Sequence, residues 1–336
     1  MNKSLLRVFA LFFFISNFSL FANNSIPKTK NWSLTISPNI GLSFGTLGEY
    51  LFSQYDKNHI VSDLQWNFSP LFKIGLMTEY NYKNFFIGGS FSYFLPTTNG
   101  NMYDSDYNND FKTNYCIFDN ESIFAIDASL KASFKIPIKK IKVSPTIIGL
   151  YSANRFVAKN GYGYFGDRET NGGWTDTDVP WNDPKARKAA SVSNIEYSRD
   201  ELFLFLGTEL EYKINKLTFL IGLFVSPITY TNVLDFHTDQ TGNTPGYKAY
   251  STQYGYFSKY MATLSINYEI NNKINFFLNV NGILSLINKG ILVTNYGRTG
   301  ISSGIFAEQN QFYLSNQQSG SNLKKLTLDW GIKLKY

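Results

Sequence analysis

The sequence predicts an all-β protein, a ten-stranded antiparallel transmembrane β-barrel with long outer loops. Three observations support this prediction: apolar residues alternate with polar ones along many segments, short and long connections alternate along the chain, and an export signal precedes them. Charged residues make up 17% of the chain and aromatic residues another 17%. This composition excludes a disordered protein, in which charge is high and apolar content is low.

Residues 1–22 have the pattern of a secretory signal peptide. Lys3 and Arg7 form a positive amino-terminal region, and a mostly apolar stretch follows them. The alternative is a single membrane anchor, but the apolar stretch is short for a span and no lipid-accepting cysteine follows it. We therefore expect an exported protein in which residues 23–336 form one barrel domain.

The last segment of the chain shows the alternation best, because every second residue is apolar and an aromatic residue ends it. The apolar face comprises Leu326, Leu328, Trp330, Ile332, Leu334 and Tyr336. A solvent-facing strand of a β-sandwich would alternate in the same way. It would not need so many aromatic residues near strand ends, nor an export signal.

Ten segments of this kind follow the signal peptide. They cover residues 32–46, 62–79, 83–96, 114–137, 140–159, 193–213, 216–232, 249–270, 273–292 and 321–336. Short turns are expected at 80–82, 138–139, 214–215 and 271–272, and long polar loops at 47–61, 97–113, 160–192, 233–248 and 293–320. Such alternation of turns and loops is typical of the bacterial outer membrane.

An even number of strands places both termini on the periplasmic side, so that the long loops face outward. Many predicted strands exceed the roughly 9–11 residues that cross a membrane, so the barrel is expected to stand above the lipid. The single Cys116 excludes a disulfide scaffold and a cysteine zinc site, and His59 and His237 are too few for a multi-histidine metal site. No metal is therefore expected. No nucleic-acid partner is expected either, since no run of Lys and Arg resembles a nucleic-acid arm.

Two short acidic motifs lie at the outer ends of predicted strands. Asp104 and Asp106 are two residues apart, which places both carboxylates on one face of an extended chain. Like charges so placed repel and tend to share a proton, which suits the positioning and activation of water. An acidic turn or a weak calcium loop is the alternative for this motif.

Asp235 and His237 have the same spacing, which lets a carboxylate orient an imidazole that acts as a general base. A simple surface pair is the alternative. Strict alternation from the apolar residues at Ile221 and Leu223 would turn both side chains toward lipid. We therefore expect a β-bulge in this strand, with Pro227 as its position.

Together these residues resemble the omptin family, the outer-membrane barrel proteases, over most of the mature chain. The matching motifs are Gly45-Thr46-Leu47 before Glu49-Tyr50, Ser62-Asp63-Leu64-Gln65-Trp66, Gly100-Asn101-Met102 before Asp104 and Asp106, and Asp235-x-His237. The resemblance implies an aspartyl-type endopeptidase in the bacterial outer membrane, a monomer whose active site faces the cell exterior. In this scheme His237, oriented by Asp235, deprotonates a water held jointly with Asp104, while Asp106 positions the scissile group.

The resemblance also implies a substrate class, peptides or proteins, and a preference for cutting beside Arg or Lys. Glu49 matches one acidic substrate-binding group of the family, but Val233 stands where the second is expected. The basic preference is therefore expected to be weaker, and Asp at position 233 is expected to strengthen it. No cofactor is expected, and a requirement for outer-leaflet glycolipid stays open. The alternative function is a non-enzymatic barrel, either an adhesin or a narrow pore.

Overall fold

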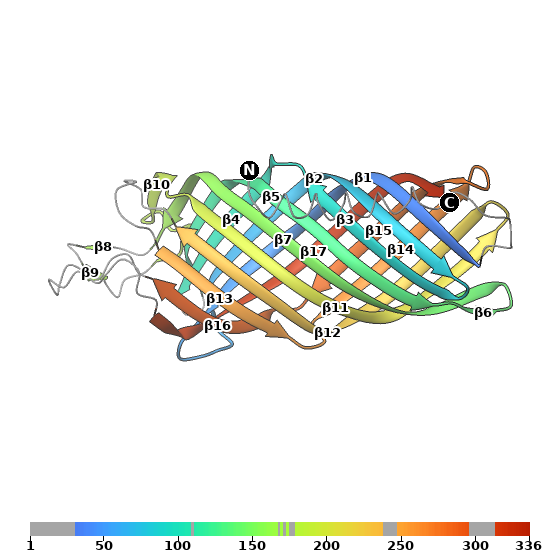
Figure 1. Ribbon diagram of the computed structural model, residues 1–336. Coiled ribbons are helices and arrows are strands. Elements are labelled where there is room, and N and C mark those ends of the chain that lie inside the picture. The colour runs from blue at the N-terminus through green and yellow to red at the C-terminus, as the bar shows by residue number, and fades with distance from the viewer. Residues whose placement is uncertain are drawn as a thin grey trace.

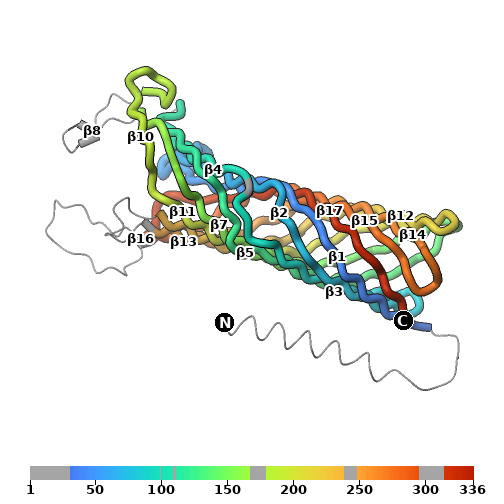
Figure 2. Tube along the Cα trace, turned by 90° about the horizontal axis from the view of Figure 1, so that it is seen from above, coloured from blue at the N-terminus to red at the C-terminus, as the bar shows by residue number. Residues whose placement is uncertain are grey.

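The computed structural model describes residues 31–108, 111–166, 169–170, 173–174, 179–237, 247–295 and 313–336. Within these residues 10 antiparallel strands close into a ring (Figures 1 and 2), which is the all-β barrel that the sequence predicts. In the same part of the chain no helix has the length and hydropathy of a membrane span. The predicted signal peptide, residues 1–22, lies outside the described residues.

Several barrel strands are interrupted and therefore carry two labels. The strands are β1 (Trp32–Phe52), β2 (Ile60–Tyr82), β3 (Phe85–Phe94), β4 (Thr97–Asn108), β5 (Phe111–Phe134), β6 (Ile136–Ile138), β7 (Ile141–Phe165), β8 (Glu169–Thr170), β9 (Gly173–Trp174), β10 (Arg187–Val192), β11 (Ile195–Ile214), β12 (Leu217–His237), β13 (Tyr247–Gly255), β14 (Lys259–Glu269), β15 (Ile274–Ser285), β16 (Asn288–Asn295) and β17 (Tyr313–Lys335). β3 with β4, β13 with β14, and β15 with β16 are successive pieces of one barrel strand each. β10 pairs with the last residues of β7.

The barrel closes where β1 pairs with β17 in antiparallel register, from Thr35 opposite Lys335 to Leu51 opposite Ser319. β12 pairs with β14 at one end and with β13 at the other, so the interrupted strands leave the ring continuous. Closure gives every barrel strand a partner on both sides and removes the exposed edges of an open sheet.

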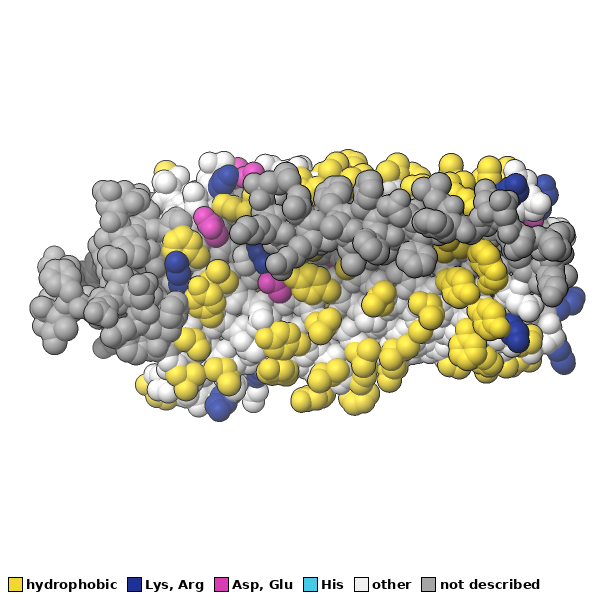
Figure 3. Space-filling view, viewed as in Figure 1, with side chains coloured by type: hydrophobic (Ala, Val, Ile, Leu, Met, Phe, Trp, Pro, Cys, Tyr) yellow, Lys and Arg dark blue, Asp and Glu magenta, His cyan; other side chains and the backbone are white. Residues whose placement is uncertain are grey.

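The pleat of the last strand separates a lipid-facing side from an interior side. Leu326 and Ile332 are each 45% exposed, whereas Thr327 and Asp329 between them are 6% and 5% exposed. The predicted apolar outer face of this strand is thus confirmed. Figure 3 shows hydrophobic side chains scattered over the wall of the barrel, with several Lys and Arg side chains near its ends.

The interior is polar, and ion pairs fill much of it between the strands. These pairs are Lys73–Asp329 at 2.8 Å, Lys131–Glu209 at 2.5 Å, Lys325–Asp127 at 2.6 Å and Lys333–Glu79 at 3.0 Å. Each pair joins two different strands, so the side chains cross-link the barrel from within. A barrel of this size has an interior that side chains can fill.

Parts of the predicted outer loops are strands instead, which corrects the sequence prediction. β1 continues to Phe52, inside the predicted loop 47–61, and β4 covers most of the predicted loop 97–113. The hairpins keep pairing above the membrane because each backbone N–H and C=O there still finds a partner across the hairpin. Asp104 and Asp106 therefore lie on a strand rather than in a loop.

Candidate active site

The candidate residues lie at the end of the barrel opposite the C-terminus, called the loop end below. Glu49 is on β1, Asp104 and Asp106 are on β4, and Asp235 and His237 are at the end of β12. Strands of 20 to 25 residues, such as β11 and β7, are about twice the length that crosses a membrane. The candidate residues therefore lie beyond the segments that span the bilayer.

Glu49 and Asp104 are held in one row by the residue between them. Leu64 of β2 pairs with Glu49 on one side and with Asp104 on the other. Residues directly opposite on antiparallel strands point to the same face, and Leu64 is buried, at 6% exposed. With strands about 4.8 Å apart, the two backbones are about 10 Å apart and both side chains point inward.

Asp104 and Asp106 share the inward face of β4, as their spacing predicts. The start of this face is set by Gly100, whose φ of 92° lies in the left-handed region, next to a register shift between Thr98 and Asn101. The side-chain amide of Asn114 donates a hydrogen bond of 3.3 Å to Asp106. Burial, the neighbouring Asp106 and the more distant Asp235 raise the pKa of Asp104 to about 8, although His237 acts in the opposite direction.

Asp235 and His237 face the interior because β12 contains the expected bulge. On β11 one residue separates Leu204 from Leu206, whereas on β12 two residues, Ser226 and Pro227, separate their partners Val225 and Ile228. The extra residue reverses the alternation, so that Leu223 is 68% exposed but Asp235 only 5%. The prediction of a bulge at Pro227 is confirmed.

The imidazole of His237 lies 2.7 Å from Asp235, between Nε2 and Oδ2. Burial lowers the pKa of His237, but Asp235, its hydrogen bond, Asp104 and Glu49 outweigh burial and raise the pKa to about 9. Some of the same groups act on Glu49, where burial and Asp235 raise the pKa well above the ordinary value. Four groups thus lie close enough to influence one another electrostatically: Glu49, Asp104, Asp235 and His237. Asp106 joins them through Asp104.

An aromatic stack crosses the barrel beneath these residues. The rings of Trp66 on β2 and Tyr197 on β11 are stacked with centroids 5.0 Å apart, and Phe156 lies against Trp66 at 6.1 Å. Trp66 pairs with Met102 on β4, and Tyr197 pairs with Asp235 on β12. The stack therefore fixes the separation between the β4 side and the β12 side of the site. Such stacks contribute about 0.5–1.5 kcal/mol beyond their buried area.

Sequence reasoning missed the charged group that lies under the site. Arg199, Glu201 and Lys259 are fully buried, and both cations lie 2.5 Å from the same Glu201 oxygen. The signal was available, because Arg199 and Glu201 have the i, i+2 spacing that singled out the other motifs. Among the described residues, no group of three His, Cys, Asp or Glu side chains is arranged to hold a metal ion.

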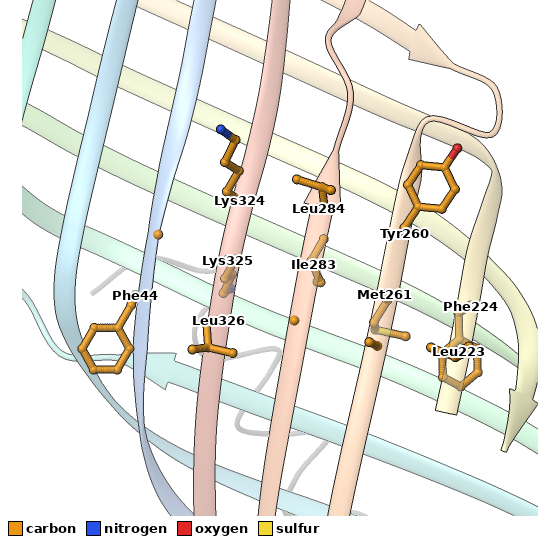
Figure 4. Close-up of a pocket in the computed structure, with 13 residues that line it drawn as sticks. Phe44, Leu223, Phe224, Tyr260, Met261, Ile283, Leu284, Lys324, Lys325 and Leu326 are labelled. Atoms are coloured by element: carbon orange, nitrogen blue, oxygen red, sulfur yellow. The ribbon is translucent and has the colours of Figure 1, made fainter. Parts of the chain in front are cut away.

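A separate cavity of about 710 Å³ lies in the barrel wall, where β1, β17, β15, β14 and β12 run side by side. Figure 4 shows apolar side chains around it, among them Phe44, Leu223 and Leu284, together with Lys324 and Lys325. None of the candidate residues lines this cavity. It belongs to the wall of the barrel rather than to the candidate site.

A family model and a solved barrel structure agree with this architecture. A family model described as the Omptin family matches residues 30–336. The crystal structure of the outer membrane protease OmpT from Escherichia coli superposes with a TM-score of 0.74 at 15% identity, covering 93% of this chain and 99% of that one. The outer membrane protein OprG from Pseudomonas aeruginosa gives a TM-score of 0.35 at 9% identity, covering 90% and 95%. A search of curated protein sequences gives no match.

Proposed function

The chain belongs to the omptin family of outer-membrane proteases, and from this premise we propose that it is an endopeptidase that uses an activated water. The observation that supports the proposal is the meeting of Asp104 from one hairpin with the Asp235–His237 pair from another. Catalytic groups on two separate hairpins can act on a peptide and a water molecule from two sides. We propose peptides or proteins as substrates and a site that opens to the cell exterior.

In the proposed reaction His237 acts as the general base. It takes a proton from a water held between His237 and Asp104, and the hydroxide attacks the carbonyl carbon of the scissile bond. The carboxylate of Asp235, 2.7 Å from the ring, stabilises the imidazolium that forms. Asp106 positions the scissile group. The proton on His237 then passes to the leaving amine, so no covalent intermediate is needed.

The remaining parts of the proposal concern the surroundings of the site. The protein acts as a monomer in the outer membrane, and it needs no metal or organic cofactor. Outer-leaflet glycolipid surrounds the loop end of such a barrel, and its effect on activity is measured by adding it to detergent-purified protein. The acidic Glu49 is proposed to bind the substrate side chain beside the cleaved bond.

A non-enzymatic barrel, acting as an adhesin or a narrow pore, is the alternative. The interior ion pairs, such as Lys73–Asp329 and Lys325–Asp127, occupy the lumen and do not favour a pore. An adhesin has no use for a partly exposed imidazole held by a buried carboxylate. Peptidase activity that depends on that imidazole separates the enzyme from both alternatives.

The test compares the parent protein with His237→Ala and His59→Ala. His59 lies in the connection between β1 and β2 and is not among the charged neighbours that shift the pKa of Asp104 or His237, so its replacement is a matched control. We expect His237→Ala to fold but to lose about 10²–10⁴-fold in rate, the usual contribution of a general base. Activity is followed by mass spectrometry of a peptide library, and folding by heat-modifiable migration in gels. Equal activity in all three proteins would contradict the proposal.

A further inference from the structure

Arg199 is a buried arginine beneath the candidate site that the proposed mechanism does not use. It is 0% exposed, and on β11 it stands directly opposite Val233 of β12. Val233 is the position at which the resemblance implies a second acidic group of the substrate pocket. The chain therefore has an apolar side chain at that position and a cation opposite it.

The guanidinium of Arg199 extends across the barrel toward Glu49. Its Nη1 donates a hydrogen bond of 2.7 Å to the backbone carbonyl of Asn322 on β17. Asn322 pairs with Gly48 of β1, the residue that precedes Glu49. The guanidinium thus acts electrostatically on the carboxyl group that the resemblance assigns to the binding of a substrate cation.

The charges beneath the pocket do not leave a negative surplus. Glu201 accepts both Arg199 and Lys259 at 2.5 Å, so two cations share one carboxylate and the group carries one positive charge. The negative charge of Glu49 offsets that surplus, so these four side chains together offer no net negative charge to a substrate cation.

One buried polar atom at this place, Oε2 of Glu49, has no hydrogen-bond partner. The side chains of Tyr197 and Arg199 interact with each other. Buried donors and acceptors without partners are costly and are satisfied when a polar ligand group reaches them. An uncharged side chain that can hydrogen-bond would meet this oxygen without bringing a second cation next to Arg199.

We infer that Arg199 determines the cleavage specificity of this protein, so that the pocket takes a neutral side chain in preference to Arg or Lys. This inference rests on the proposed peptidase function. A substrate guanidinium entering the pocket would meet the guanidinium of Arg199 at close range, where the low dielectric of the interior strengthens the repulsion. Specificity of this kind arises from a repulsive group as much as from an attractive one.

The parent protein provides the first test. Its cleavage sites in a peptide library are identified by mass spectrometry, and four matched peptides are then made with Arg, Lys, Gln or Ala beside the cleaved bond. We expect larger kcat/KM values for Gln and Ala than for Arg and Lys. A parent protein that prefers Arg or Lys would overturn the inference while leaving the peptidase function intact. A folded parent protein that cleaves no peptide at all would instead count against the proposed function.

Substitutions at position 199 provide the second test. Arg199→Gln leaves Lys259 and Glu201 as a neutral pair, so that Glu49 becomes the uncompensated charge. We expect the ratio of kcat/KM for the Arg peptide to that for the Ala peptide to rise about tenfold or more. Arg199→Lys keeps the charge and should keep the parent ratio. Arg155→Gln is the matched control, because Arg155 is paired with Asp200, whose side chain is 37% exposed. An unchanged ratio in folded Arg199→Gln would overturn the inference.

Discussion

Nε2 of His237 lies 2.7 Å from Oδ2 of Asp235, and this contact sets the charge of the proposed base. The pKa of His237 is raised to about 9, so the ring is protonated at neutral pH. A protonated imidazole cannot accept a proton from water. The contact that orients the base therefore also moves the pH range in which the base works.

The pH dependence of activity follows from these pKa values. With His237 at about 9 and Asp104 at about 8, kcat/KM should increase as pH rises toward 9, since each group must lose its proton to hold and activate water. The sequence alone predicts that activity falls only as pH drops through the ordinary histidine pKa of about 6.5. A profile of kcat/KM between pH 5 and 10 checks this prediction. A plateau already reached at pH 7 would contradict it.

Asp235→Asn should separate the two roles of the carboxylate. The variant removes the negative charge that raises the pKa of His237, so the rising limb of the pH profile should move to lower pH. The maximal rate should fall by about 10²-fold, because the imidazolium that forms is no longer stabilised by an anion. Asp200→Asn is the control, since Asp200 pairs with Arg155. A lower rate without a shift of the pH profile would contradict the electrostatic explanation.

Gly100→Ala should disturb the position of Asp104 without unfolding the barrel. Gly100 has a φ of 92°, and a Cβ there would lie 2.6 Å from the backbone oxygen of Asn67. The start of β4 must shift to relieve this contact, and a displacement of about 1 Å at a catalytic group can cost about 10²-fold in rate. Gly282→Ala is a matched control, because a Cβ at Gly282 has nothing within 4 Å. Equal peptidase rates in both variants would contradict the prediction.

The interior ion pairs predict a contrast in stability. Lys73→Met leaves Asp329 without its 2.8 Å partner inside the barrel, where both side chains are 7% exposed. Loss of one partner of a buried pair costs about 3–5 kcal/mol, so the free energy of unfolding should fall by that order. Lys142→Met removes a pair in which the lysine is 48% exposed, and such pairs contribute about 0–1 kcal/mol. Denaturant titration of both variants measures the difference, and equal losses would contradict it.

The sequence predicted those features that depend on local pattern. Alternation located the strands, and the mismatch between lipid-facing Leu223 and inward Asp235 was sufficient to place a bulge at Pro227. Strand ends at the loop end were less predictable, because pairing continues there without the apolar residues that mark the membrane segment. β4, for example, carries Asp104 and Asp106 within a region expected to be a loop.

The floor of the site could not be predicted because it depends on contacts across the barrel. Arg199 bonds Asn322, which is 123 residues away in sequence. Trp66 stacks on Tyr197 from a strand on the other side of the ring. Spacing along the sequence does not predict which side chains contact each other across the interior of the barrel. The local motif of Arg199 and Glu201 was visible, but its partner Lys259 depends on the closed barrel.

The substitution Val233→Asp is the final prediction, and the structure changes what is expected from it. The sequence alone predicts that the new carboxylate strengthens the preference for Arg by one to two decades, the effect of a charge-assisted hydrogen bond of about 1.5–3 kcal/mol. In the barrel, however, position 233 is the direct cross-strand neighbour of Arg199. Such neighbours have Cβ atoms about 4.5–5.5 Å apart, so the new carboxylate should pair with Arg199 instead of a substrate.

The single variant Val233→Asp should therefore raise the Arg-to-Ala ratio of kcat/KM by only about tenfold, as Arg199→Gln does, because the new carboxylate neutralises Arg199 and leaves Glu49 as the one uncompensated charge. The double variant Val233→Asp with Arg199→Gln has two uncompensated carboxyl groups, at positions 49 and 233. Its ratio should rise by about one to two decades above that of the parent protein. Matched Arg and Ala peptides measure all three proteins side by side. A single variant whose ratio equals that of the double variant would mean that Arg199 does not neutralise the new carboxylate, and identical ratios in all three proteins would mean that position 233 does not line the pocket.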